Sequence, residues 1–266
     1  MNLLNSFRSE WILLNRPRLW VGLGLTTVVF AAVATWLLME SAEPVGRGGD
    51  GPGVSLEALT GSGGATAAVI SSMGFATVLV VAAFAAAMGN EITRGTLRAA
   101  LAKQPSRLTL IAGKLAARVS LASILMAVAL IVGAVTAAVV APSADVDTGG
   151  WLGADALGSG IADYGRLLVF VSMYALIGTT VAVLVRSTPI ALGICLLWFG
   201  PIENVLGEGR EWAERWFPGL VMRSLVQPDS PGALSLGTTL TTLSLYAVMC
   251  GGVIAYAMSR RDVTAG

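Results

Sequence analysis

The largest group of basic side chains in the chain lies between residues 90 and 114. This segment holds one acid, Glu91, and long apolar runs flank it on both sides. Cations gathered in this way are suited to ionic contacts with a partner rather than to acid–base catalysis. We therefore expect this segment to be the place where a membrane-embedded protein meets a partner in the cytosol. Its basic residues are Arg94, Arg98, Lys103, Arg107 and Lys114.

Residue types that support catalysis or metal binding are scarce. The chain has no histidine, which removes both the imidazole base and the imidazole metal ligand. It has no G-x-x-x-x-G-K-[ST] phosphate loop, because Leu115 follows Gly113-Lys114. We expect no catalytic residue, no metal and no cofactor in this chain. The two cysteines, Cys195 and Cys250, lie in apolar runs and are expected to pack as small hydrophobic residues.

The composition indicates a membrane protein. Hydrophobic residues make up 55% of the chain and charged residues only 12%, against about a quarter charged in an ordinary soluble domain. So few charges cannot cover a water-facing surface, whereas lipid tolerates apolar side chains on the outside of a helix bundle. We predict an all-α, polytopic membrane protein in which residues 1–266 form a single transmembrane domain.

Six long apolar runs are predicted to cross the bilayer, since a crossing needs about 20 residues. The first is expected to be retained rather than cleaved as a signal peptide, because its apolar core is too long. The fifth is the shortest, with Glu203 at its far end. The predicted transmembrane helices cover residues 19–39, 66–88, 108–140, 164–185, 188–206 and 238–258.

Two further segments are predicted to lie at the membrane surface. Residues 1–18 suit an amphipathic interfacial helix, with Arg8, Glu10 and Asn15 off its apolar stripe. Residues 207–232 are too aromatic for a free loop and are predicted to form an outer re-entrant segment between the fifth and sixth helices. The apolar stripe of the first segment consists of Leu3, Leu4, Phe7, Trp11 and Leu14.

Residues 90–105 are predicted to form a short helix that Pro105 ends. Arg94 and Arg98 would lie on one side of this helix. We expect Glu91 to pair with one of these arginines, or to contact a partner or the N-terminal helix. The opposite side would carry Ile92, Leu97, Ala100 and Leu101.

Charges sort to opposite ends of the predicted bundle. The end with both termini and the basic segment carries twelve of the seventeen basic residues and only three of the sixteen acids. The positive-inside rule therefore predicts that both termini are cytosolic, in the cytoplasmic membrane of a bacterium. Lys114 and Arg118 would extend to the cytosolic interface.

The basic segment resembles a family signature. Glu91-x-x-x-Gly95-Thr96-Leu97-Arg98, followed by Leu101-Ala102-x-x-Pro105-Ser106-Arg107, is similar to the signature of ABC-2 type permeases, the membrane subunits of type V ABC exporters. The order of the predicted elements extends this resemblance over essentially the whole chain. The resemblance implies that residues 90–105 are a coupling helix that contacts an ATPase subunit. The residues implied in coupling are Glu91, Arg94, Gly95, Thr96, Leu97, Arg98, Leu101, Pro105 and Arg107.

The resemblance further implies an exporter that works by alternating access, with ATP and Mg bound by the separate ATPase subunit. A second permease copy or a paralogue would complete the transporter, and no nucleic acid is involved. The charge-free spans suggest a hydrophobic or amphipathic cargo, such as a drug, a peptide antibiotic or a lipid. The second and fifth spans would line its path, with Met73, Phe75, Phe84, Trp198 and Phe199 as candidate lining residues.

Other functions are compatible with parts of the sequence. An ATP-independent secondary transporter or channel would need polar groups at mid-depth, where the spans offer only Thr and Ser. A membrane scaffold remains open, whereas an intramembrane enzyme would need a catalytic cluster that we do not find. The basic segment could also be an ordinary cytosolic loop that fixes the topology, and each candidate lining residue could face lipid or pack in the core.

Overall fold

The computed structural model describes residues 3–42, 54–103, 106–207, 209–228, 230 and 232–260. These residues form helices and contain no β-strand, which confirms the predicted all-α class. Six helices are long and apolar enough to cross a membrane, as predicted. They are α2 (Pro17–Glu40), α4 (Gly64–Thr93), α6 (Arg107–Val140), α7 (Ala154–Val185), the run Thr188–Gly207 and α12 (Leu236–Arg260).

Two of these helices extend well beyond their predicted bounds, whereas the others differ by one or two residues at an end. Helix α7 begins at Ala154 rather than at residue 164, because its first turns pack onto α4: Thr66 donates a hydrogen bond to the buried Asp163 carboxylate at 2.5 Å. Helix α4 continues to Thr93, and so includes residues that we predicted to begin a separate helix at residue 90. That prediction is wrong at its N-terminal end, since no residue there stops the helix before Gly95.

The fifth membrane-spanning run is continuous but irregular. It consists of α8 (Thr188–Leu197), a π-helical turn (η2, Trp198–Ile202) and α9 (Glu203–Gly207). Pro201 lies inside the turn and cannot donate a backbone hydrogen bond, which is a common cause of a widened turn. The run therefore passes Pro201 and includes the buried acid Glu203.

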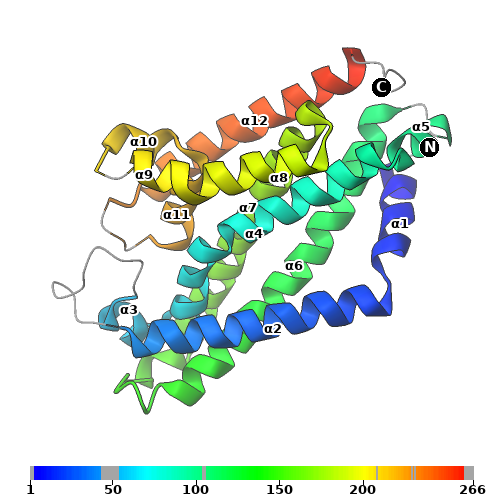
Figure 1. Cartoon of the computed structure of the whole chain (residues 1–266). Helices are drawn as coiled ribbons and strands as arrows, with labels where there is room; N and C mark the ends of the chain where they lie inside the picture. The colour runs from blue at the N-terminus through cyan, green and yellow to red at the C-terminus, as the bar shows by residue number, and fades with distance from the viewer. Residues whose placement is uncertain are drawn as a thin grey trace.

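The shorter helices gather at the two ends of the bundle (Figure 1). One end carries α1 (Leu3–Leu14), α5 (Thr96–Lys103) and the last turns of α12; we call it the basic end. The α7–α8 turn joins it, since the Thr93 and Thr188 hydroxyls lie 2.8 Å apart. The opposite end carries α3 (Leu56–Thr60), η1 (Gly149–Trp151), α9, α10 (Glu211–Trp216) and α11 (Pro218–Val226).

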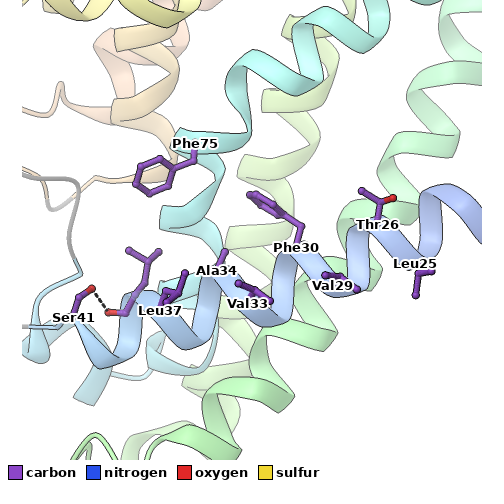
Figure 2. A pocket seen from close by; sticks show the side chains of 10 residues that line it. Leu25, Thr26, Val29, Phe30, Val33, Ala34, Leu37, Ser41 and Phe75 are labelled. Carbon is purple, nitrogen blue, oxygen red and sulfur yellow. Dashed lines mark hydrogen bonds between the residues drawn. The ribbon is translucent and has the colours of Figure 1, made fainter.

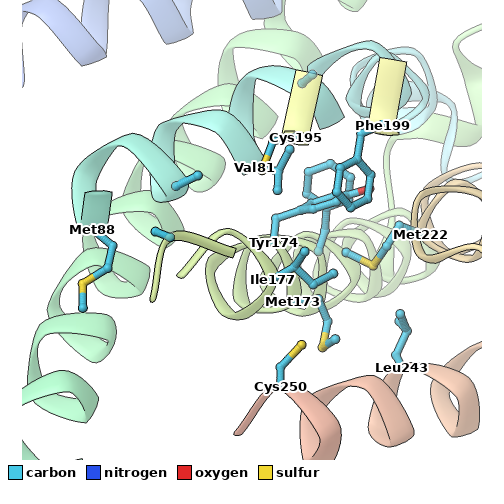
Figure 3. Close-up of a cluster of buried hydrophobic side chains, with 14 of the residues drawn as sticks. Val81, Met88, Met173, Tyr174, Ile177, Cys195, Phe199, Met222, Leu243 and Cys250 are labelled. Carbon is cyan, nitrogen blue, oxygen red and sulfur yellow. The ribbon is translucent and has the colours of Figure 1, made fainter. Parts of the chain in front are cut away.

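The centre of the core lies between α4, α7 and the fifth run. Tyr174 is fully buried, and its ring stacks edge-on against Phe170 at 4.8 Å and Phe199 at 5.5 Å between centroids (Figure 3). Its hydroxyl lies 3.4 Å from that of Thr77. In the most apolar windows of the helices, 61% of α7 is buried but only 17% of α2, so α7 is the central helix and α2 the peripheral one.

A groove of about 780 Å³ runs along the peripheral helix α2. Phe75 of α4 points toward the groove from the opposite wall (Figure 2). The walls are almost wholly apolar, as expected of a surface that faces lipid. Its other lining residues are Leu25, Thr26, Val29, Phe30, Val33, Ala34, Leu37, Leu38 and Ser41.

The core assignment predicts unequal effects for two phenylalanines. Phe170 is fully buried, so Phe170→Ala leaves a cavity and should lower the unfolding free energy by about 3 kcal/mol or more. Phe75 is 55% exposed, and Phe75→Ala should change it by less than about 1 kcal/mol. Unfolding of both variants in detergent would measure the difference, and equal losses would contradict this core.

Candidate functional site

Four charged side chains meet at the basic end, where α1, α4 and α6 converge. Lys114 of α6 lies 2.6 Å from the Glu10 carboxylate of α1 through its Nζ. Arg118, one turn further along α6, donates two hydrogen bonds to Glu10 Oε1, from Nε at 2.9 Å and from one terminal nitrogen at 2.8 Å. Helix α1 is thus held on α6 by an arginine that donates two hydrogen bonds and by a lysine.

Glu91, in the last turn of α4, completes the group. Lys114 Nζ lies 3.1 Å from Glu91 Oε1 and 3.0 Å from Oε2, and Arg118 also donates a hydrogen bond to Oε1. The group therefore has two carboxylates and two cations, which we call the ion cluster. The Glu10 side chain is only 4% exposed and that of Glu91 18%. Charged groups buried to this degree are stable only when opposite charges replace their lost solvation, and here two cations balance two carboxylates.

Local sequence explains how the ion cluster forms. Lys114 and Arg118 are four residues apart and so project from the same face of α6. The α1 backbone comes very close to α6 at Gly113, where an added Cβ would lie 2.4 Å from Ser6 Cβ and 2.9 Å from Phe7 N. Only glycine permits this approach. It brings Glu10, one turn beyond Ser6, within reach of both cations.

Helix α1 is polar on its inner face and apolar on its outer face. Ser6 is fully buried and Glu10 is 3% exposed, whereas the exposed fractions of Leu4 and Ile12 are 66% and 72%. This is the reverse of a helix on a soluble protein, where apolar residues face the core. Phe7 and Trp11 stack along the helix, with centroids 5.8 Å apart.

The neighbouring cations control the ionisation of Glu10. Burial alone would raise the pKa of its carboxyl group, but Arg118 and Lys114 outweigh burial and hold this pKa below its usual value of 4.5. Glu10 is thus charged at neutral pH although it is buried.

The structure narrows two predictions from the sequence about this cluster. Of the alternatives predicted for Glu91, an ion pair with Arg94 or Arg98 is not formed among the described residues, and Glu91 pairs with Lys114 and Arg118. The two cations on α6, predicted to extend to the cytosolic interface, are each only 9% exposed, because Glu10 and Glu91 lie beside them. The i,i+4 spacing of the cations was visible in the sequence, but their partners 23 to 108 residues away were not.

The segment after the ion cluster is a tight turn followed by α5. Gly95 has a φ of +70° and its N–H donates to Ile92 O at 3.2 Å, so it ends α4 in the left-handed conformation that glycine adopts without strain. No atom lies within 4 Å of an added Cβ at Gly95, so glycine is favoured here by the backbone conformation and not by a lack of space. Thr96 then begins α5, and its hydroxyl donates to Glu91 O at 3.2 Å.

Helix α5 rests on the core through one face. Leu97 is 2% exposed, and Ile92, Ala100 and Leu101 pack against the core, on the side that we predicted. Arg94 and Arg98 are exposed, and no described residue pairs with either. Arg107 instead donates a hydrogen bond to Met258 O at 2.9 Å, which joins α6 to α12. Pro105, predicted to end the helix, lies outside the described residues.

The candidate path residues do not come together in one place. Met73 and Phe84 are buried, with exposed fractions of 1% and 7%. Trp198 packs its ring against Phe217 at 5.6 Å. Of the five candidates, Phe75 and Phe199 line a common cavity, between α4, the fifth run and α11.

The ion cluster predicts a large cost for removing one carboxylate. Glu10→Ala leaves two buried cations with a single anion and should lower the unfolding free energy by about 3 kcal/mol. Glu211→Ala, at an exposed position of α10, is the matched control and should have little effect. Denaturant unfolding in detergent would measure both, and a similar small loss for the two variants would contradict a role of the cluster in holding α1.

Acid should weaken the same contact. Because folding lowers the pKa of Glu10, its contribution to stability is present above a pH of about 4.5 and is lost as the pH falls through the lowered value. The melting temperature of the wild type should therefore fall more steeply on acidification than that of Glu10→Gln. Parallel curves for the two proteins would exclude this contribution.

Comparison of the chain with models of known protein families finds no match, and comparison with curated proteins finds none either.

Proposed function

We propose that this chain is the membrane permease subunit of an ATP-binding cassette exporter, and that a separate ATPase subunit docks on α5. The proposal rests on the way in which α5 is attached to the bundle. Its apolar face is fixed to the core through Leu97, while Arg98 of α5 and Arg94, just before the Gly95 turn, are exposed and have no partner among the described residues. A short helix held in this way offers a charged surface to a soluble protein.

The ion cluster gives this docking surface a mechanical connection to the bundle. A force on α5 reaches α4 through the Gly95 turn, because Thr96 is hydrogen-bonded to Glu91. It reaches α6 and α1 through the contacts of Glu91 and Glu10 with Lys114 and Arg118. In this proposal, closure of two ATPase subunits moves the coupled helices together and shifts the permease from an inward-open to an outward-open state.

The other parts of the transporter follow from this role. ATP and Mg bind to the ATPase subunits, and this chain itself performs no catalysis. A second copy of the permease, or a paralogue, completes the path. The basic end faces the cytosol of a bacterium, a proposal supported by the concentration of basic residues at that end.

Two shorter elements are proposed to lie at the membrane surfaces. The exposed leucine and isoleucine side chains of α1 support a position in the inner interface, where they can enter lipid while Glu10 stays paired. Helices α10 and α11 are proposed to be the outer re-entrant segment. Trp212, Trp216 and Phe217 support this position, since aromatic residues are enriched at membrane interfaces.

Charge reversal on α5 and at the turn before it tests the docking surface. Arg94→Glu with Arg98→Glu should reduce co-purification of the ATPase subunit by tenfold or more, since both exposed cations would become anions. The fold should persist, because neither arginine is buried. Quantitative mass spectrometry of material purified from native membranes would measure the ratio of the two subunits.

The matched control is Arg215→Glu, at an exposed position of α10 at the opposite end of the bundle. It should leave the subunit ratio unchanged. An equal ratio in all three proteins, or no ATPase subunit even with the wild type, would overturn the proposed function.

A further inference from the structure

A cavity of about 310 Å³ lies at the end of the bundle opposite the ion cluster. Helix α4 supplies Phe75, Thr77 and Val78 to its wall, and Phe199 of the π-helical turn lies across from them. Glu203 is the only acid in this wall, and it is 2% exposed. The cavity thus combines aromatic rings with a carboxylate that is almost wholly removed from water.

The Glu203 carboxylate is held in place by the start of α11. Gly219 donates its backbone N–H to Glu203 Oε1 at 2.9 Å. An added Cβ at Gly219 would lie 2.0 Å from Oε2, so the carboxylate packs directly on the α11 backbone. This contact joins the fifth run to α11 and fixes the position of the carboxyl group in the cavity wall. The carboxylate forms no ion pair with any described residue.

Arg223 supplies the one positive charge at this cavity, but its position differs from that of Glu203. It is exposed, and it also lines a second cavity of about 300 Å³ whose wall contains Glu214. Water and Glu214 therefore screen Arg223, whereas Glu203 is shielded from water. We call the cavity of about 310 Å³ the inner cavity. The electric field inside it is consequently dominated by the buried carboxylate.

We propose that the inner cavity binds an amphipathic cation, with Phe75 and Phe199 around its apolar body and Glu203 providing the electrostatic attraction. Aromatic rings favour the same charge, because their faces attract cations. This inference rests on the proposed function, since it narrows the cargo of the exporter from any amphiphile to one that carries a positive charge. Phe75 also lines the groove along α2, which offers the ligand a route from the lipid side (Figure 2).

Two probes of the same shape and opposite charge test the proposal: tetraphenylphosphonium and tetraphenylborate. Binding to the purified chain in lipid nanodiscs would be measured by equilibrium dialysis, with binding to empty nanodiscs subtracted. The measurement is made at about pH 8, on the alkaline side of neutrality, because burial opposes the ionisation of a carboxyl group. We expect the wild type to bind the phosphonium cation and to discriminate against the borate anion.

Two variants should change this binding in opposite directions. Glu203→Gln keeps an acceptor for the Gly219 N–H but removes the charge, so it should bind the cation at least about tenfold more weakly. Arg223→Gln removes the opposing charge at an exposed position and should bind the cation more tightly. The second variant tests the sign of the field even if the first folds poorly, which its melting temperature would show.

Three results would overturn the proposal: a wild type that does not bind the cation or prefers the anion, Glu203→Gln that binds the cation as the wild type does, or Arg223→Gln that binds it no more tightly. The assay contains no ATPase subunit. Failure here would therefore reject the cationic cargo and leave docking on α5 as a separate question, answered by the subunit ratio.

Discussion

Three buried charges and the partly buried charge of Glu91 must neutralise one another where α1, α4 and α6 meet, and the arrangement of the basic end depends on this requirement. Removing charges from water costs several kcal/mol for each ion unless partners replace the lost solvation. Lys114 and Arg118 each contact both carboxylates, so the loss of any one charge would leave the remaining ones without a full set of partners. The last turn of α4 is therefore fixed to the N-terminal helix and to the third membrane-spanning helix at once.

The two ends of the bundle treat charge differently. At the basic end the buried charges are balanced, while Arg94 and Arg98, which pair with no described residue, are exposed. At the opposite end the buried carboxylate of Glu203 forms no ion pair with a described residue, faces a cavity and accepts a backbone hydrogen bond. Balanced charges leave little field to attract a ligand, whereas an unpaired charge attracts a ligand of opposite sign. In the proposed exporter, this contrast separates the docking surface at one end of the bundle from the binding cavity at the other.

The sequence predicted the elements better than the contacts between them. Length and apolarity identified the six helices that are long and apolar enough to cross a membrane, because a bilayer imposes both properties. The buried position of Leu97 and the exposed positions of Arg94 and Arg98 were also predicted, since helical spacing puts them on different sides. The ion cluster was missed because its partners come from α1, α4 and α6, and only the Gly113 approach brings Glu10 to the cations. The fifth span, predicted as residues 188–206, is observed as Thr188–Gly207, but its π-helical turn and the contact of Glu203 with Gly219 of α11 were not predicted.

The central claim is that α5 touches a nucleotide-hydrolysing protein. A photo-crosslinking amino acid at Ala99, an exposed position of α5, tests it most directly when illuminated in native membranes. The account predicts one dominant cross-link, to a soluble protein that carries a phosphate-binding loop, and none from the same group at Trp212 of α10. Cross-links from Ala99 only to lipid, or to no ATPase, would contradict the account.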